Sequence, residues 1–365
     1  MSESVSIVLR RSGLLGGCRI DPSPAVLDSG EWMVGPEVGD GVEWRFAPGL
    51  LRFDQWIAFD LLADGDEMPV FIFHLCEGGS GASFGMIFGL LNACSARFRM
   101  PLAATAQDRW LYDREGAWLK PCCYGDRVDL ARVDRAILKV FRKGDAPVRW
   151  CMTPPRVFDS APPRLTDPIL PRGPLIDEMG QSRLRAWPER TASVGELVDR
   201  LRGDLAASPE RRGPEGRSRW GGCAALNFGA SGFFRTHHDG SRWWLVDPDG
   251  CAFWSAGMDC VRIDATCRID GVEKALAWAP PEHGEYAPAH SRPPGRGHIV
   301  SFALANLVRA FGGDWRNAWE TITLAHLRDW GFNTIANWSD WKLAARAAFP
   351  YTRPLTPSFP STPRV

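Results

Sequence analysis

Seven prolines fall between residues 153 and 175, and this density disfavours regular sheet or helix there. Proline has no backbone N–H to donate to a sheet, and a dense run of prolines favours extended chain. A domain boundary is therefore expected within this segment or just after it. The 365 residues are enough for two or three domains of roughly 100–200 residues each. The predicted organisation is a lead-in over 1–30, one domain over 31–158, a linker with a connecting helix over 159–232, and a second domain over 233–365.

Short apolar runs separated by glycine-containing turns characterise residues 31–158. Residues 69–75 form one continuous apolar run, which ends at the Gly-Gly-Ser-Gly sequence of residues 78–81. The runs 136–141 and 147–152 flank a Lys-Gly-Asp turn, a pattern that predicts a β-hairpin. Several short strands at close spacing are typical of an all-β sandwich. We therefore predict that the first domain is a β-sandwich.

Helix and hairpin signals follow the prolines. Ser193 and Glu196 have the spacing of a capping box, which predicts the first turn of a helix. The Asp-Gly at 239–240 and the Asp-Pro-Asp-Gly at 247–250 are turn sequences, and they predict two consecutive β-hairpins. The pair Trp243–Trp244 lies on the strand between these turns. We expect both of its side chains in the core.

The last third of the chain has a β-α-β pattern. A strand is predicted over 251–258, helices over 300–311 and 315–330, and a buried strand over 332–338. Gly331 stands where a helix commonly ends. Strands joined by a helical crossover lie parallel in one sheet. The pattern therefore predicts an α/β second domain in which these two strands are neighbours.

Composition narrows the classes of function. The 43 basic residues balance the 43 acidic ones, which argues against a general nucleic-acid binder or an anionic-membrane binder, because both need a basic surface. No apolar run approaches the roughly 18 residues of a membrane span. The N-terminus lacks the apolar core of a signal peptide, so the chain as written is expected in the cytoplasm, the alternative being an export signal that is missing or unconventional. The ten cysteines and seven histidines lack zinc-ligand spacing, so we predict no metal and no other cofactor.

Aromatic residues are the outlier in this composition. The chain has 17 Trp and 19 Phe but only four Tyr. Trp rings stack on sugar rings, which favours a protein that binds or cleaves carbohydrate. The same rings also fill cores and interfaces. The count alone leaves both interpretations open.

Four stretches, in this order, resemble the β-agarases of glycoside hydrolase family 50. They are residues 174–181 (PLIDEMGQ) with the Trp-Pro at 187–188, residues 234–250, residues 253–262, and residues 327–340. The Glu-Arg at 189–190 stands where the family usually has Gly-Lys. The resemblance covers roughly 174–355. It implies a jelly-roll, carbohydrate-binding-like domain followed by a (β/α)8 barrel.

The barrel implied by the resemblance locates a substrate site. In (β/α)8 folds the functional residues lie at the C-terminal ends of the strands. There a Trp ring that stacks on a sugar, beside side chains that hydrogen-bond to hydroxyl groups, makes a substrate subsite. A structural alternative stays open, in which Asp259 and Arg262 form an ion pair at the rim and Trp338 is packing. The predicted substrate-binding residues are Asp259, Arg262, Asn337, Trp338, Ser339 and Asp340.

No catalytic residue is assigned within this chain. Retaining glycosidases use two carboxyl groups about 5–5.5 Å apart, and the resemblance places this Glu pair on later strands, beyond Val365. A (β/α)8 barrel needs about 250 residues, whereas 123 run from Trp243 to Val365. We therefore expect an incomplete barrel with an unpaired edge and an uncovered apolar face. Such surfaces predict poor solubility for this chain by itself.

Three functions are compatible with the sequence. The favoured one is an agarase-like glycoside hydrolase that cleaves β-galactosidic bonds in a galactose-containing polysaccharide, present here without its catalytic Glu pair. The second is non-catalytic carbohydrate binding by the sandwich through Trp56, Trp110 and Trp118. The third is a barrel of another specificity, such as a β-galactosidase or a mannanase-like enzyme. The oligomeric state is left open.

Overall fold

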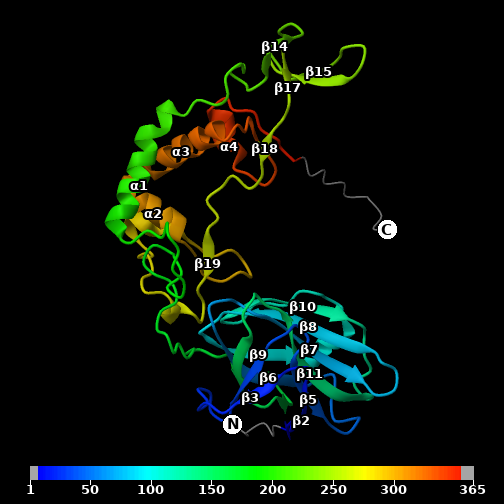
Figure 1. Ribbon diagram of the computed structural model, residues 1–365. Coiled ribbons are helices and arrows are strands. Elements are labelled where there is room, and N and C mark those ends of the chain that lie inside the picture. Colours follow the sequence, from blue (N-terminus) through cyan, green and yellow to red (C-terminus); the bar gives the residue numbers. More distant parts are fainter. Residues whose placement is uncertain (1–6, 355–365) are drawn as a thin grey trace. The chain divides into compact units, whose positions relative to one another are not determined.

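The computed structural model describes residues 7–354 (Figure 1). The chain divides into two compact units that interleave along the sequence. Unit 1 holds the residues up to Arg190 together with Arg268–Ala279 and Pro293–His298. Unit 2 holds Thr191–Cys267, Pro280–Arg292 and the residues from Ile299 onward. Each unit has a hydrophobic core of its own.

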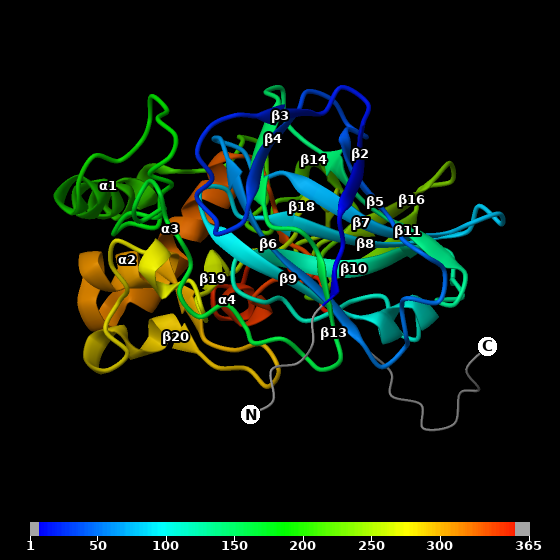
Figure 2. The same cartoon turned by 90° about the horizontal axis from the view of Figure 1, so that it is seen from below.

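Unit 1 is a sandwich of two antiparallel sheets (Figures 1 and 2). The strands of the first sheet are β1 (Ile7–Val8), β3 (Arg19–Asp21), β4 (Glu31–Gly35), β6 (Trp56–Asp64), β9 (Ser95–Pro101), β12 (Val148–Met152) and β13 (Arg156–Phe158). The strands of the second sheet are β2 (Arg11–Leu15), β5 (Gly41–Arg45), β7 (Val70–Glu77), β8 (Ser83–Leu90), β10 (Trp118–Gly125) and β11 (Val133–Arg142). The first sheet has the order β1-β13-β6-β12-β4-β3, with β9 also paired to β6, and the second has the order β10-β8-β7-β11-β5-β2. A short 3-10 helix, η1 (Leu102–Ala106), follows β9.

Aromatic rings from both sheets meet in the core of unit 1. The ring centroid of Phe98 lies 4.6 Å from that of Phe59 and 4.9 Å from that of Phe88. It also lies 5.2 Å from the centroid of Phe73 and 4.9 Å from that of Trp118. All five side chains are buried, and a fully buried large apolar side chain contributes roughly 1.5–3 kcal/mol. The predicted β-sandwich is thus confirmed, and its two inner faces pack through these rings.

The sandwich differs from the prediction in two places. Strands β1, β2 and β3 lie within residues 7–21, where we expected a lead-in, and they pair with β13, β5 and β4. Their residues are exposed or half-buried, so they lack the apolar periodicity by which strands are recognised. The hairpin predicted over 136–152 is wrong, because β11 pairs with β5 and β7 whereas β12 pairs with β4 and β6 in the other sheet. The turn between β11 and β12 therefore crosses from one sheet to the other.

Residues 159–190, in the region predicted to be a linker, pack on the sandwich. The N–H of Ile169 donates to Oγ of Ser95 at 2.7 Å, and the N–H of Ser95 donates to the carbonyl of Ile169 at 3.0 Å. Leu175 is buried in the sandwich core. Its N–H donates to the carbonyl of Ala275 at 2.7 Å. A part of the chain a hundred residues further on thus completes unit 1.

His74 on β7 makes the stability of unit 1 depend on pH. Its Nδ1 lies 2.9 Å from Oγ of Ser83. Burial, helped by the charge of Lys139, lowers the pKa of His74 from 6.5 to about 4. The unfolded chain therefore binds this proton first, so acid favours unfolding between pH 6.5 and 4. We expect unit 1 to lose about 2 kcal/mol over this window from His74 alone, after allowance for its partial exposure.

Urea titrations of the chain and of its His74→Gln variant at several pH values would check this expectation. Glutamine keeps a polar partner for Ser83 but does not titrate. The variant should lose less stability than the parent chain between pH 6.5 and 4.5. Parallel pH curves for the two proteins would show that His74 is not the sensitive group.

Unit 2 combines helices with small sheets. The helices are α1 (Val194–Ala207), α2 (Phe302–Phe311), α3 (Trp315–Asp329) and α4 (Trp341–Arg346), and short 3-10 helices are η2 (Ser208–Glu210), η4 (Gly284–Ala289) and η5 (Gly312–Asp314). The strands β14 (Cys223–Asn227), β15 (Arg235–His238), β16 (Trp243–Val246) and β17 (Cys251–Phe253) form an antiparallel sheet of order β14-β17-β16-β15. The strands β18 (Gly257–Met258) and β22 (Thr334–Ile335) form a two-stranded parallel sheet. A three-stranded sheet has the order β19 (Thr266–Arg268), β21 (Ile299–Ser301), β20 (His290–Ser291). The 3-10 helix η3 (Glu273–Ala275), which follows β19 in the sequence, belongs to unit 1.

The start of α1 and the two hairpins are confirmed. Oγ of Ser193 accepts from the N–H of Glu196 at 3.1 Å, as in a capping box. The carboxylate of Glu196 accepts from the N–H of Ala192 at 2.7 Å, one residue before the usual partner. Strand β16 pairs with β15 on one side and with β17 on the other.

The parallel pairing predicted from the β-α-β pattern is also confirmed. Gly257 pairs with Thr334 and Met258 pairs with Ile335. The predicted strand 251–258 is divided, because its first part is β17 in the antiparallel sheet and only β18 joins β22. A further parallel bridge joins Ile335 to Tyr351. Residues 7–354 contain no closed ring of strands, so the (β/α)8 barrel stays a prediction.

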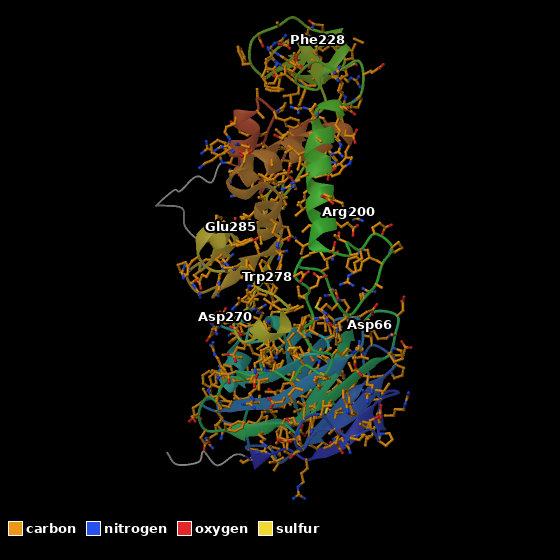
Figure 3. All side chains as sticks on the ribbon, turned by 90° about the vertical axis from the view of Figure 1, so that its left-hand side faces the viewer. Asp66, Arg200, Phe228, Asp270, Trp278 and Glu285 are labelled. Atoms are coloured by element: carbon orange, nitrogen blue, oxygen red, sulfur yellow. The ribbon has the colours of Figure 1, made fainter. Side chains whose placement is uncertain are left out.

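Large aromatic side chains are exposed on unit 2. Trp254 is 82% exposed and Trp243 is 70% exposed. The expectation that Trp243 lies in the core is therefore wrong. Trp244 is half-buried and its indole N–H donates to Asp239 at 2.6 Å. Figure 3 labels Phe228 beside this sheet, and its ring centroid lies 4.3 Å from that of His237.

We expect the purified chain to self-associate through these exposed rings. Isolated exposed apolar residues are normal, but several large rings on a small unit favour contact between molecules. Light scattering after size-exclusion chromatography would show a mass that rises with protein concentration. Changing both Trp243 and Trp254 to Lys should reduce that rise. A monomer at every concentration in the parent chain would contradict the prediction.

Candidate functional site

The parallel strands β18 and β22 end side by side, and the predicted site residues follow their carboxyl ends. Asp259 comes directly after β18, and Asn337 comes two residues after β22. The N–H of Asn337 donates to Oδ1 of Asp259 at 2.8 Å. The N–H of Cys260 donates back to the carbonyl of Asn337 at 2.9 Å. The two strand ends are thus held together by reciprocal hydrogen bonds.

Ser339 and Asp340 extend this connection. The N–H of Val261 donates to Oγ of Ser339 at 2.9 Å, and the N–H of Asp340 donates to the carbonyl of Val261 at 2.9 Å. The carboxylate of Asp340 also accepts from Nη2 of Arg316 at 2.5 Å. Arg316 in turn donates to Glu320 at 3.1 Å on the same helix, α3. The hydroxyl of Ser339 and the carboxylate of Asp340 are therefore engaged in holding the site together.

Arg262 is fixed by two partners. Its Nη1 donates to the carbonyl of Trp338 at 3.1 Å, and its Nε pairs with Asp264 at 2.8 Å. The hydrogen bond to Asp264 raises the pKa of the guanidinium above its usual range. The alternative ion pair between Asp259 and Arg262 is absent from the ion pairs of the described residues. Arg262 therefore orients the backbone that carries Trp338.

Trp338 presents its ring to solvent. The side chain is 62% exposed, so the ring is not packed in a core of the described residues. Its φ is +59°, in the left-handed region that favours glycine. For a bulky residue this conformation costs of order 1–3 kcal/mol and is found preferentially at functional sites. The backbone therefore holds an aromatic plate outward at the end of β22.

The structure brings all six predicted substrate-binding residues together at one edge. Three groups there have no hydrogen bond to another described residue: the side-chain amide nitrogen of Asn337, the second carboxylate oxygen of Asp259, and the indole N–H of Trp338. One stacking ring with two donors and one acceptor can hold a sugar ring and its hydroxyl groups. Whether these residues bind a substrate stays a prediction.

Asn333 is a residue of this region that the sequence analysis did not single out. It lies at the start of the β22 segment and is buried. Its Nδ2 donates to the carbonyl of Gly221 at 3.0 Å and to that of Trp254 at 2.9 Å. Its Oδ1 accepts from the N–H of Ala256 at 2.9 Å. The signal that could have identified it is an Asn directly before a buried strand.

No metal or membrane feature is found in the described part of the chain. Over residues 7–354, no three His, Cys, Asp or Glu side chains form a group that could hold a metal ion. Within the same range, no helix combines the length and the apolar character that a bilayer crossing needs.

Two curated proteins of Vibrio sp. (strain JT0107) are similar to part of the chain. β-Agarase B is 34% identical over 197 residues, which cover 46% of this chain and 20% of the relative. β-Agarase A is 33% identical over 199 residues, which cover 48% of this chain and 19% of the relative. The chain is a relative of the β-agarases. The resemblance inferred from its four stretches is thereby confirmed, and the aligned part spans about a fifth of the length of these relatives.

Solved structures of agarases are also similar to the chain. An agarase, AgWH50C, is 18% identical with a TM-score of 0.47, and the match covers 93% of this chain and 53% of that one. An exo-β-agarase is 19% identical with a TM-score of 0.46, covering 96% of this chain and 56% of that one. No protein-family model matches the chain.

Proposed function

We propose that this chain supplies the sandwich and the first substrate subsite of an agarase-like glycoside hydrolase that acts on galactose-containing polysaccharide. The observation that carries the proposal is the gathering of Asn337, Trp338 and Asp259 at the carboxyl ends of two parallel strands. In a (β/α)8 barrel this edge is the functional one. Unit 2 would then be the opening part of such a barrel.

The roles of these residues follow from their geometry. The exposed ring of Trp338 stacks on one face of a sugar. The free amide of Asn337 donates to a hydroxyl, and the open oxygen of Asp259 accepts from another. In this proposal Asp259 and Asp340 have positioning and binding roles and serve neither as acid nor as nucleophile. The Glu pair that retaining hydrolysis requires comes, in this proposal, from sequence outside the chain.

A reducing-sugar assay on agarose oligosaccharides tests the proposal. The chain would be assayed by itself and after fusion to the C-terminal part of one of the Vibrio β-agarases. We expect no release of reducing ends by the chain alone and measurable release by the fusion. Activity of the 365-residue chain alone would show that a catalytic pair lies within it, and an inactive but folded fusion would count against the proposed subsite.

A second candidate function, glycan binding by unit 1, is favoured by a cavity at the edge of the sandwich. The cavity has a volume of about 190 Å³ and lies where β9 and β10 approach. Trp56 and Tyr112 line it, with the guanidinium of Arg99 5.4 Å from the Trp56 ring centre. Arg99 forms a largely buried ion pair with Glu115 in the same cavity. Aromatic rings beside such a pair can stack on a sugar and hydrogen-bond to its hydroxyl groups.

Affinity electrophoresis in agarose gels tests this second function. Trp56 and Trp118 both line the cavity, whereas Trp110 is exposed outside it. Trp118 is only 2% exposed, which corrects the expectation that it binds at the surface. The parent chain should be retarded in agarose relative to polyacrylamide alone. Trp56→Ala should restore free mobility, and Trp110→Ala should not. Mobility that agarose leaves unchanged would exclude this function.

A further inference from the structure

A second cavity, in unit 2, is lined by positive charge. It has a volume of about 340 Å³, within the range of about 300–1,000 Å³ typical of small-molecule sites. It lies between the loop 211–221, the end of α3 and the segment 349–350. No Asp or Glu is among the residues that line it. The five arginines that line it are Arg211, Arg212, Arg217, Arg219 and Arg328.

Two of these arginines are neutralised by carboxylates. Arg211 pairs with Asp204 at 2.8 Å, and Arg219 pairs with Asp249 at 2.9 Å. The other three have no carboxylate partner among the ion pairs of residues 7–354. Three uncompensated charges around one cavity give it a positive potential that attracts anions.

Of the three arginines without a carboxylate partner, only one is accounted for by a contact with the end of a helix. Nη1 of Arg217 lies 3.4 Å from the carbonyl of Gly331, just past the end of α3, and cations are favoured at that end of a helix. Arg212 makes no such contact. The guanidinium of Arg328 lies 5.4 Å from the ring centre of Phe349. Arg212 and Arg328 therefore contribute donors that no acceptor of the described chain uses.

Trp220 adds a neutral donor to the cavity. It lines the cavity, and its indole nitrogen is buried without a hydrogen-bond acceptor among the described residues. A buried donor without an acceptor is destabilising and uncommon in native proteins. An acceptor bound in the cavity would relieve it. Donors without acceptors thus come from two kinds of side chain, one charged and one neutral.

We propose that this cavity binds a tetrahedral oxyanion, sulfate or phosphate, either free or as an ester on a sugar. Its oxygens would accept from the guanidinium groups of Arg212 and Arg328 and from the indole N–H of Trp220. Phe332 and Phe349 line the same cavity and offer apolar surface to a sugar ring. The site is distinct from the predicted substrate edge, because Asn333 and Arg328 lie before β22 and not after it.

Thermal unfolding of the full chain tests the site with stated probes. Sodium sulfate and sodium phosphate would be compared with sodium chloride at equal ionic strength, and galactose 6-sulfate with galactose. We expect the oxyanions, but not chloride or galactose, to raise the unfolding temperature of unit 2. An ester ligand is indicated if galactose 6-sulfate acts at one tenth or less of the sulfate concentration, and a free oxyanion if the two concentrations are similar. No shift with any oxyanion would overturn the proposal.

Variants connect the effect to this cavity. Arg328→Met and Trp220→Phe should each raise the half-saturating oxyanion concentration at least tenfold. The matched control is Arg292→Met, an exposed arginine of unit 2 paired with Glu282, which should bind as the parent does. In nuclear magnetic resonance spectra, the indole N–H signal that Trp220→Phe removes should move on addition of sulfate. Equal responses in all variants, or a stationary Trp220 signal, would overturn the proposal.

Discussion

Replacing Asn333 by alanine is expected to unfold unit 2 while unit 1 stays folded. The side chain joins three separate segments, because it bonds the carbonyls of Gly221 and Trp254 and the N–H of Ala256. Alanine would leave these three part-buried backbone groups without their partner. Each buried unpaired group costs about 1–3 kcal/mol, so the total loss is about 4 kcal/mol. That is a large fraction of the stability of a small unit.

Hydrogen exchange followed by mass spectrometry would resolve the two units. In Asn333→Ala, amides of β17, β18 and β22 should exchange at least a hundredfold faster, and amides of the sandwich core should exchange as in the parent. Asn337→Ala is the matched control, since Asn337 is only half-buried and its side-chain nitrogen is free. Unchanged protection in β22 would show that Asn333 does not hold the unit together.

Replacing Trp338 by alanine is expected to reduce activity about thirtyfold in the active fusion with the remainder of a β-agarase. A central aromatic contact is worth about 2 kcal/mol when truncated, and each 1.4 kcal/mol is about tenfold. The loss should appear in kcat/KM for agarose oligosaccharides. The fold should be unaffected, because the ring is mostly exposed and alanine removes little buried surface.

Trp330 provides the control for that measurement. Its ring is 59% exposed, nearly as much as that of Trp338, but it directly follows α3 and precedes β22. Trp330→Ala should therefore leave kcat/KM within a factor of two. Equal losses in the two variants would mean that Trp338 acts through general surface effects and not through a subsite.

Local signals in the sequence were sufficient for several elements. The capping box at Ser193, the Asp-Gly turns of the two hairpins and the glycine after α3 each determine a conformation through their own chemistry, and each is present in the structure. The parallel pairing of β18 with β22 followed from a general rule on crossovers. These features depend on a few neighbouring residues, which a single sequence displays.

Features decided by distant partners could not be predicted in this way. The turn between β11 and β12 contains the residues of a hairpin turn. The two strands nevertheless belong to different sheets, since β11 pairs with β7 and β12 pairs with β6. The strands β1 to β3 are recognised only by their pairing, since their side chains show no apolar period. The exposure of Trp243 depends on whether another element packs over β16, and the sequence around β16 does not indicate this.

The candidate site was predicted by position and not by contact. The resemblance to a (β/α)8 barrel placed the six residues at the C-terminal ends of the strands, and in the structure they lie together at that edge. The specific pairing was different, since Arg262 bonds Asp264 and Asp259 bonds the backbone of Asn337. Which residues form a hydrogen bond depends on side-chain rotamers and on the exact course of each loop. The residue types alone do not specify either. Asn333 was missed for the same reason, because its three partners come from two segments that are distant in the sequence, Gly221 and residues 254–256.

The interleaving of the two units sets the order in which the protein can be completed during synthesis. Val272 and Ala275 belong to the sandwich core, although the ribosome makes them only after α1 and the four-stranded sheet. A sandwich cut at Arg190 would lack these two core residues and the partner of Leu175. The sandwich core therefore stays incomplete during synthesis until residue 298 has left the exit tunnel. In that interval its apolar side chains are the surface that a chaperone would bind.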